Sequence, residues 1–158
     1  MGTRNDLARP FIFYVATLVF FSIGGITAPN IGWYQTLALP SWMIPDSFVA
    51  VIWGILVLLS ALSLALFWDR HRASSRFGIT VAFYAGNALL ILLWNFLFFG
   101  MHALFPAFIV SILAGLSVVG IIIHLWRIAR PAALLMTPYL AWMVFAIYLN
   151  YIASLLNT

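Results

Sequence analysis

The sequence predicts an all-α integral membrane protein, a single bundle of five transmembrane helices with its N-terminus inside and its C-terminus outside. Hydrophobic residues make up 66% of the 158-residue chain and charged residues only 6%, whereas soluble domains are roughly 45–50% apolar. The apolar residues form five uncharged runs, each near the roughly 20 residues that span a bilayer as a helix. A transmembrane β-barrel would alternate apolar and polar residues in segments of about ten, and the chain shows no such alternation.

Charged or turn-rich breaks set the expected limits of the five helices. The helices are expected at 11–27, 47–68, 77–100, 103–126 and 132–155. The first, an apolar run after two Arg, also has the form of a secretory signal peptide. Pro29 directly after the would-be cleavage site favours a retained helix. Pro138 leaves the carbonyl of Leu134 without its helical donor and predicts a kink in the fifth helix.

The arginines provide an independent test of this threading. All seven lie in alternate breaks: Arg4, Arg9, Arg70, Arg72, Arg76, Arg127 and Arg130. Positive residues concentrate in cytoplasmic loops, so the N-terminus and the second and fourth breaks are expected inside. The pI of about 10.0 therefore reflects membrane orientation. Nucleic-acid binding would need basic residues clustered on one solvated face, so no nucleic-acid partner is predicted. The apolar spans instead predict contact with membrane lipid.

The longest loop, 28–46, is expected on the outer side. Its three prolines prevent a regular helix, and its large aromatic residues, Trp33, Tyr34 and Trp42, would be costly to leave in water. The loop is expected to fold back as a lid over the outer ends of the helices. The alternative is that these rings form an aromatic belt at the level of the lipid headgroups.

Side chains of Asp, Glu, Lys and Arg are absent from the predicted spans. All ten charged residues fall outside them, which argues against a proton pump or an ion channel, because these use intramembrane charges. The chain has no Cys, and therefore no disulfide or thiolate ligand. His71, His102 and His124 have no partner at ligand spacing, so no metal site is predicted, although His102 could touch a ligand that enters from outside.

Several helical stripes combine aromatic, amide and small side chains at a spacing of 3.6 residues. They comprise Asn87, Ile91, Trp94, Asn95 and Phe98 in the third helix, Trp142, Ala146, Leu149 and Asn150 in the fifth, and Trp53, Val57 and Ser60 in the second. Facing inward, they would line an aromatic cavity suited to a flat, apolar ligand. Mutual packing is the alternative. On the fourth helix, Ala107, Ser111 and Gly115 form a small-residue track typical of close helix packing or dimerisation.

A set of motifs between Trp33 and Asn150 resembles the tryptophan-rich sensory protein family, also called the translocator protein or peripheral benzodiazepine receptor family. The motifs are Trp33-Tyr34, Pro40-Ser41-Trp42 with Pro45, Trp53, Tyr84-Ala85, Trp94, Phe98-Phe99-Gly100, and Pro138-Tyr139-Leu140-x-Trp142-x-x-Phe145-Ala146-x-Tyr148-Leu149-Asn150. The last of these is the most specific.

The resemblance implies a five-helix bundle of a bacterial inner membrane, often a homodimer, with a pocket that opens on the loop side. It implies a receptor or sensor for porphyrin or haem, with no required cofactor. Light-dependent oxidative breakdown of porphyrin, with Trp53 and Trp142 as catalytic residues, and transport of such molecules are the alternatives. The expected ligand-binding residues are Trp33, Tyr34, Trp42, Trp53, Val57, Asn87, Ile91, Trp94, Phe98, Trp142 and Ala146.

The chain departs from the family pattern in ways that bear on the ligand. The family usually has Gln and, four residues on, Asn in the third helix, where this chain has Asn87 and Ile91. A loop Lys is replaced by Leu39, and a Pro usually found two residues after the third-helix Trp is Phe96 here. The expected pocket is therefore more apolar, and it lacks an outer cation for the carboxylates of a porphyrin.

Overall fold

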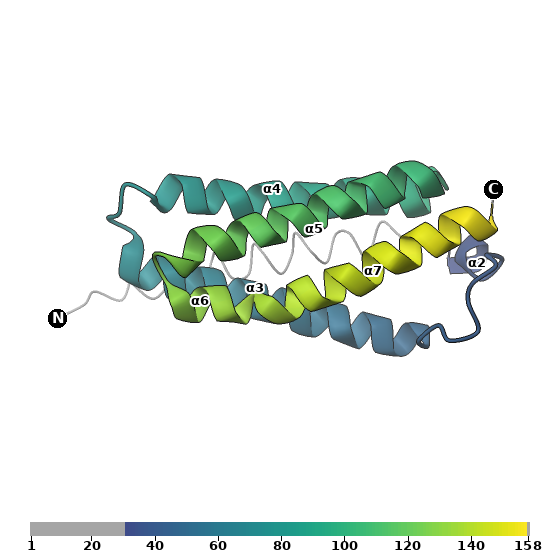
Figure 1. Ribbon diagram of the computed structural model, residues 1–158, viewed down its shortest axis with the longest axis horizontal. Helices are drawn as coiled ribbons and strands as arrows, with labels where there is room; N and C mark the ends of the chain where they lie inside the picture. Colours follow the sequence, from purple (N-terminus) through teal and green to yellow (C-terminus); the bar gives the residue numbers. More distant parts are fainter. Residues whose placement is uncertain (1–30, 158) are drawn as a thin grey trace.

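The computed structural model describes residues 31–157, and every regular element in that range is helical. A short helix, α2 (Ile31–Tyr34), and a loop lead into the bundle (Figure 1). The bundle consists of α3 (Asp46–His71), α4 (Phe77–Asn95) with its π-helical continuation η1 (Phe96–Gly100), α5 (Leu104–Trp126), α6 (Arg130–Leu135) and α7 (Thr137–Leu156).

Four stretches within residues 31–157 are long and apolar enough to cross a bilayer. They are Asp46–Trp68, Phe77–Gly100, Leu104–Trp126 and Arg130–Leu156. The prediction of an all-helical membrane fold is confirmed to this extent. The first predicted helix, 11–27, lies outside the described residues, and the inside and outside assignment stays a prediction.

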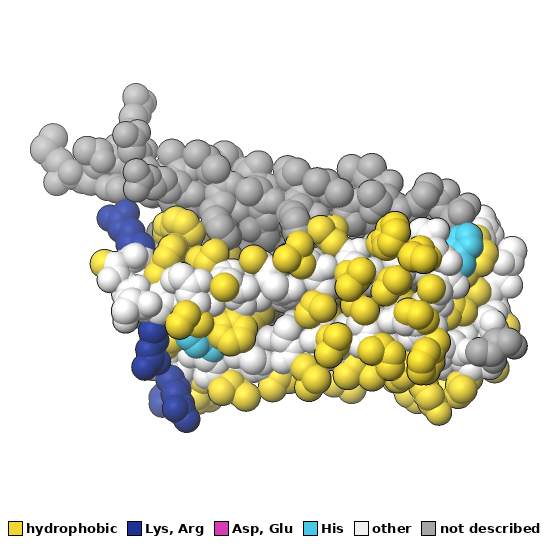
Figure 2. Space-filling view, turned by 90° about the horizontal axis from the view of Figure 1, so that it is seen from above, with side chains coloured by type: hydrophobic (Ala, Val, Ile, Leu, Met, Phe, Trp, Pro, Cys, Tyr) yellow, Lys and Arg dark blue, Asp and Glu magenta, His cyan; other side chains and the backbone are white. Residues whose placement is uncertain are grey.

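The surface of the bundle matches a lipid environment. Large apolar side chains are more than half exposed along the helices, including Phe48 at 62%, Leu116 at 61% and Val144 at 64%. Figure 2 shows such side chains covering the described part of the visible face, with the arginines gathered at one end. Water would disfavour so large an exposed apolar surface. Helices suit this setting because their backbone polar groups are satisfied internally.

The two ends of the bundle differ in the segments that they carry. The arginine end carries the α3–α4 and α5–α6 connections, with Arg70, Arg72, Arg76, Arg127 and Arg130. The loop end carries α2, the first turn of α3 and the last turn of α7 (Figure 1).

The arginine half of the bundle is closely packed. The side chains of Leu64, Phe67 and Leu125 are almost completely buried there, in one cluster with residues of α6. Ser63 Oγ donates to the carbonyl of Ala132 at 2.6 Å and lies 2.6 Å from the Tyr84 hydroxyl. These bonds join α3, α4 and α6 in one place.

The predicted kink in the last span is present as a break between α6 and α7 at Met136. Pro138 stands in the first turn of α7, where its missing N–H costs least. The carbonyl of Leu134 accepts a hydrogen bond from the Thr137 hydroxyl at 2.8 Å instead. The expected helix 132–155 is thus two helices with different directions.

The small-residue track on α5 is used for packing within one chain. Ala107, Ser111 and Gly115 are all buried. A Cβ atom added at Gly115 would lie 2.8 Å from the Cδ1 atom of Ile147 on α7. The absent side chain lets α5 and α7 approach closely.

Candidate functional site

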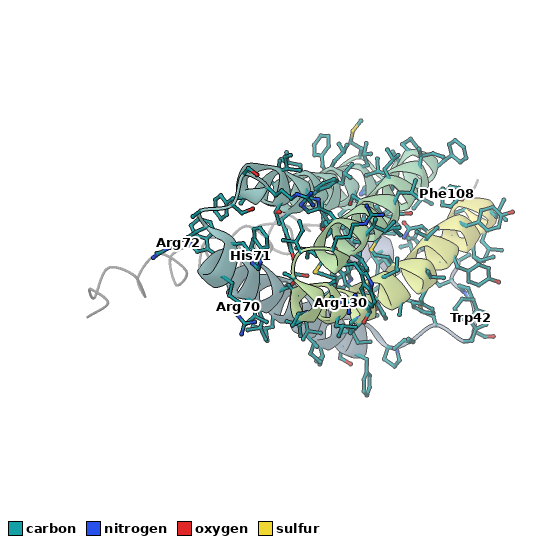
Figure 3. The ribbon with its side chains drawn as sticks, turned by 60° about the vertical axis from the view of Figure 1, so that its left-hand side comes forward. Trp42, Arg70, His71, Arg72, Phe108 and Arg130 are labelled. Carbon is teal, nitrogen blue, oxygen red and sulfur yellow. The ribbon has the colours of Figure 1, made fainter. Side chains whose placement is uncertain are left out.

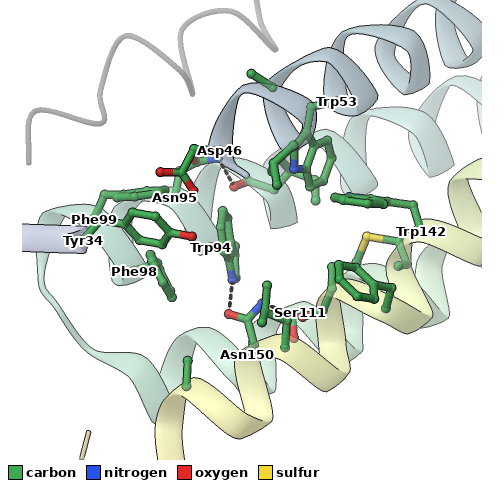
Figure 4. A pocket seen from close by; sticks show the side chains of 18 of the residues that line it. Tyr34, Asp46, Trp53, Trp94, Asn95, Phe98, Phe99, Ser111, Trp142 and Asn150 are labelled. Carbon is green, nitrogen blue, oxygen red and sulfur yellow. Dashed lines mark hydrogen bonds between the residues drawn. The ribbon is translucent and has the colours of Figure 1, made fainter. Parts of the chain in front are cut away.

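A cavity of about 510 Å³ lies in the loop half of the bundle, between α3, α4 with η1, and α7 (Figure 4). This volume is within the range of roughly 300–1,000 Å³ of small-molecule sites. Ser111 contributes from α5, and Tyr34, Leu39 and Met43 contribute from α2 and the following loop.

The cavity exists because α3 has different neighbours along its length. At the arginine end α3 packs against α6. Beyond Met136, α7 packs mainly against α5, and Figure 1 shows it diverging from α3 toward the loop end. The space between α3 and α7 is therefore left for side chains and for a ligand.

Trp94 forms one wall of the cavity and is held in place. Its indole Nε1 donates a hydrogen bond of 2.9 Å to Asn150 Oδ1 across the bundle. Its ring stacks on Phe98, with ring centroids 5.0 Å apart. Asn150 in turn donates to the carbonyl of Ala146 at 2.7 Å. The ring orientation is thus fixed before any ligand binds.

Trp53 and Trp142 form the part of the wall nearest the middle of the bundle. Their ring centroids lie 6.4 Å apart with the planes nearly perpendicular. Trp53 also meets the edge of the buried Tyr139 ring at 6.1 Å. Indole Nε1 of Trp142 is buried and has no acceptor among the described residues. A buried donor without an acceptor is unfavourable, and its burial separates this donor from the open space of the cavity.

The loop end of the cavity is its polar end. Asp46, Tyr34 and Asn95 lie there, on the other side of Trp94 from Trp142 (Figure 4). Burial, followed by the charge and the hydrogen-bond acceptance of Asp46, raises the pKa of Tyr34 to about 12. The Tyr34 hydroxyl therefore stays protonated at neutral pH.

Eight of the eleven sequence-predicted binding residues line this cavity. They are Tyr34, Trp53, Val57, Ile91, Trp94, Phe98, Trp142 and Ala146. The stripes on the second, third and fifth predicted helices therefore face one another across a cavity.

Asn87 lies outside the cavity, in a buried hydrogen-bonded network. Its Nδ2 donates to Ser117 Oγ at 2.8 Å and, more weakly, to the carbonyl of Ala114 at 3.3 Å. Its Oδ1 accepts from the Tyr139 hydroxyl at 3.1 Å. With its oxygen and its amide hydrogens engaged, Asn87 connects α4, α5 and α7.

Trp33 and Trp42 also lie outside the cavity wall. Trp33 stacks on His102 at 3.9 Å and meets the edge of Phe98 at 5.7 Å. Trp42 stacks on Tyr148 at 5.8 Å and is 49% exposed. Both rings hold the loop against the end of the bundle, and Trp33 supports a wall residue from behind.

A further connection fixes this loop to the end of α7. The backbone N–H of Ala38 donates to Asn157 Oδ1 at 2.8 Å, and Asn157 Nδ2 donates to the Ala38 carbonyl at 3.0 Å. The described part of the expected lid, residues 31–45, is therefore tied to the bundle by one amide side chain as well as by its rings.

Three further wall residues, Asn95, Leu149 and Asn150, lie on the predicted inward stripes but were not among the expected ligand-binding residues. The wall residues that the sequence prediction assigned to neither group are Leu39, Met43, Asp46, Val49, Ala50, Phe99, Ser111, Met143, Phe145 and Ala153. Helical spacing offered a signal for some of them, since Val49 and Ala50 precede Trp53 by four and three residues. Asp46 carries no such signal, because it lies one residue before the expected helix 47–68.

The histidines form no metal centre in residues 31–157, where no group of three or more His, Cys, Asp or Glu side chains could hold a metal ion. His124 Nε2 lies 2.9 Å from the Thr80 hydroxyl. His71 stacks on Phe67 at 5.1 Å. Neither these two nor His102 lines the cavity.

These features define a multi-pass integral membrane protein with an aromatic cavity between its helices. Residues 11–155 match the TspO/MBR family, and the chain belongs to that family. The chain is 32% identical to the tryptophan-rich protein TspO of Chlorobaculum tepidum over 129 residues, 82% of each chain. It is 33% identical to the translocator protein of Ovis aries over 153 residues, 92% of this chain and 90% of the other. It is also 30% identical to protein CrtK of Rhodobacter capsulatus, over 92% of this chain and 91% of that protein.

Proposed function

We propose that this protein is a membrane receptor or sensor that binds a flat, largely apolar ligand, such as a tetrapyrrole, in the cavity between α3, α4 and α7. The observation that carries the proposal is the facing of Trp53, Trp94 and Trp142 around one cavity of about 510 Å³. Indole rings offer a large apolar area with little loss of side-chain entropy. Membership of the TspO/MBR family supports the same function.

The polar groups of the wall support specific binding rather than simple lipid filling. The Trp94–Asn150 hydrogen bond fixes one aromatic surface, and preorganised surfaces lose less entropy on binding.

The experiment is a titration of protein in nanodiscs with protoporphyrin dimethyl ester, followed by tryptophan fluorescence. Trp142→Ala is expected to weaken binding at least about tenfold, as for a buried tryptophan at the centre of an interface. Trp126→Ala is the matched control, because Trp126 is 45% exposed at the arginine end. Equal affinity of wild type and Trp142→Ala would reject the proposal.

A second candidate function is light-dependent oxidation of the bound tetrapyrrole by dioxygen, favoured by the contact of Trp53 with Trp142 at 6.4 Å. Mass spectrometry of illuminated, aerated mixtures should then show protein-dependent products. Trp53→Phe and Trp142→Phe keep an aromatic wall but remove the indole, and should abolish the products while the ester still binds. Products that persist in both variants exclude a catalytic role for these residues.

Transport is the third function to separate from sensing. The name of the Ovis aries relative, translocator protein, supports this third candidate. Protein in sealed vesicles that binds the ester without moving it into the lumen acts as a receptor. Uptake that disappears in Trp142→Ala would instead make the cavity part of a transport route.

A further inference from the structure

One charged side chain, Asp46, lies on the cavity wall within residues 31–157. It occupies the first turn of α3 at the loop end, beside Asn95 and Tyr34 (Figure 4). We propose that Asp46 makes the cavity select flat ligands whose edge at the loop end is neutral or cationic, and makes it disfavour ligands with carboxylates there. This inference rests on the proposed function and specifies the ligand class of the same cavity.

The described cations are too far away to compensate Asp46. The five arginines within residues 31–157 lie at the opposite end of the molecule (Figure 2), and Figure 3 shows Arg70 and Arg72 far from Trp42 of the loop. The 26 residues of α3 separate the two ends by about 39 Å at about 1.5 Å per residue. Charges in solvent are screened over roughly 8 Å at physiological salt. A carboxylate on a ligand would therefore meet Asp46 without a nearby arginine from this range.

The partial charge of the α3 N-terminus offsets Asp46 only in part. A helix N-terminus carries roughly half a positive elementary charge, and a carboxylate carries a full negative one. Replacing Asp46 by Asn therefore reverses the sign of the local field, since the helix terminus remains. The same substitution should weaken a cationic ligand and strengthen an anionic one.

The apolar wall and the exposure of Asp46 act in opposite directions on the size of this effect. The low-dielectric wall strengthens charge interactions. Asp46 is itself exposed, and exposed ion pairs contribute little. We therefore expect a change in Kd of about twofold to fivefold for each charged ligand.

The test compares three probes with one ring system on the full chain in zwitterionic nanodiscs. They are protoporphyrin with two free carboxylates, its neutral dimethyl ester, and a bis-amide that carries two quaternary ammonium groups. The titrations are carried out at low salt, because salt screens the interactions between charges. The ratio of variant to wild-type Kd for each probe cancels its partition into lipid.

In Asp46→Asn, the dicarboxylate should bind about twofold to fivefold more tightly and the dication should weaken similarly, while the ester changes less than either. Asp46→Glu restores the charge and should restore the wild-type order. Asp69→Asn is the matched control, because it is the same substitution near the other end of α3.

The outcomes separate this inference from the proposed function. Ester binding that requires Trp142, together with charged probes that do not respond to Asp46→Asn, overturns charge selection and leaves the proposed function standing. No ester binding by wild type overturns both. Equal responses to Asp46→Asn and Asp69→Asn would show a general surface-charge effect, and would also overturn selection by Asp46.

Discussion

Asn87 and Asn150 are both buried amides on helix faces that point inward, but they have different neighbours. Asn87 binds Tyr139 and Ser117 and lies away from the cavity. Asn150 lines the cavity and accepts the hydrogen bond of Trp94. Residue type and helical spacing are the same for both, so only the identity of the bonded neighbour separates a packing role from a binding role.

Asn87→Leu is expected to lower the free energy of unfolding by about 1 kcal/mol, a typical value for hydrogen bonds between membrane helices. It leaves the Tyr139 hydroxyl without its acceptor but does not alter the cavity wall. Ester affinity should stay within about twofold of wild type. Thermal unfolding in detergent and tryptophan quenching measure the two effects.

Asn150→Leu is the matched comparison for Asn87→Leu. It removes a similar bond, but it also frees the Trp94 ring, so ester affinity should fall as well. If Asn87→Leu weakened ester binding as much as Asn150→Leu does, Asn87 would have a binding role that the cavity geometry does not give it.

The elements of the site are positioned by a small number of contacts between segments far apart in the chain. The loop before α3 is connected to the end of α7 through Ala38 and Asn157. The α5–α7 pair is brought close by Gly115. The first contact fixes the loop that contributes Leu39 and Met43 to the cavity wall, and the second lets α7 lie close to α5.

Asn157→Ala should increase the dissociation rate of the ester severalfold, because it removes both hydrogen bonds between the side chain and Ala38, each worth about 1 kcal/mol. Stopped-flow fluorescence measures the rate. Asn157→Asp keeps the acceptor for the Ala38 N–H and loses the donor, so its rate should be intermediate. Unchanged rates in both variants would mean that the rings of Trp33 and Trp42 hold the loop without Asn157.

Gly115→Leu should destabilise the bundle by about 1–3 kcal/mol through overpacking against α7. Gly115→Ala should cost less, because the close contact of its Cβ would be with the terminal Cδ1 atom of Ile147 at 2.8 Å, while Met143 Cβ would lie at an ordinary 3.9 Å. Removing that atom with Ile147→Val should therefore reduce the cost of Gly115→Ala. Thermal unfolding of wild type, Gly115→Ala, Ile147→Val and the double variant measures the coupling between the two positions. Strictly additive changes in stability would contradict the contact.

The whole molecule is asymmetric from end to end. The arginine end is filled by the cluster around Phe67 and Leu125, and the loop end encloses the cavity. Because Arg concentrates in cytoplasmic loops, the cavity is expected to open to the outer side of the membrane. The expected homodimer also stays a prediction. The small-residue track that could have served dimerisation, Ala107, Ser111 and Gly115, is buried within one chain.

This orientation can be tested directly because the chain has no Cys. Gln35→Cys at the loop end and Ser75→Cys at the arginine end each introduce one thiol at an exposed position. In intact cells, a membrane-impermeant maleimide should label Gln35→Cys and should label Ser75→Cys only after lysis. The reverse pattern would contradict the arginine-based orientation.

Composition and periodicity determine a large part of this protein without reference to the fold. Uncharged runs of suitable length predict the four spans found in residues 31–157, and 3.6-residue spacing places Trp53, Trp94 and Trp142 on inward faces. These features depend only on residues close together in the chain, and for that reason the sequence alone can specify them. The Arg distribution is also local, and it predicts an orientation.

Which inward-facing residues surround a space and which fill one depends on the packing of the helices against one another. The cavity depends on the divergence of α7 from α3 beyond Met136, and Asn87 and Ile91, one turn apart, fall on different sides of that division. The position of Asp46 on the wall depends on where α3 begins and on how the loop folds back onto α7. These features follow from contacts between residues far apart in the sequence, and a local sequence pattern holds no information about such contacts.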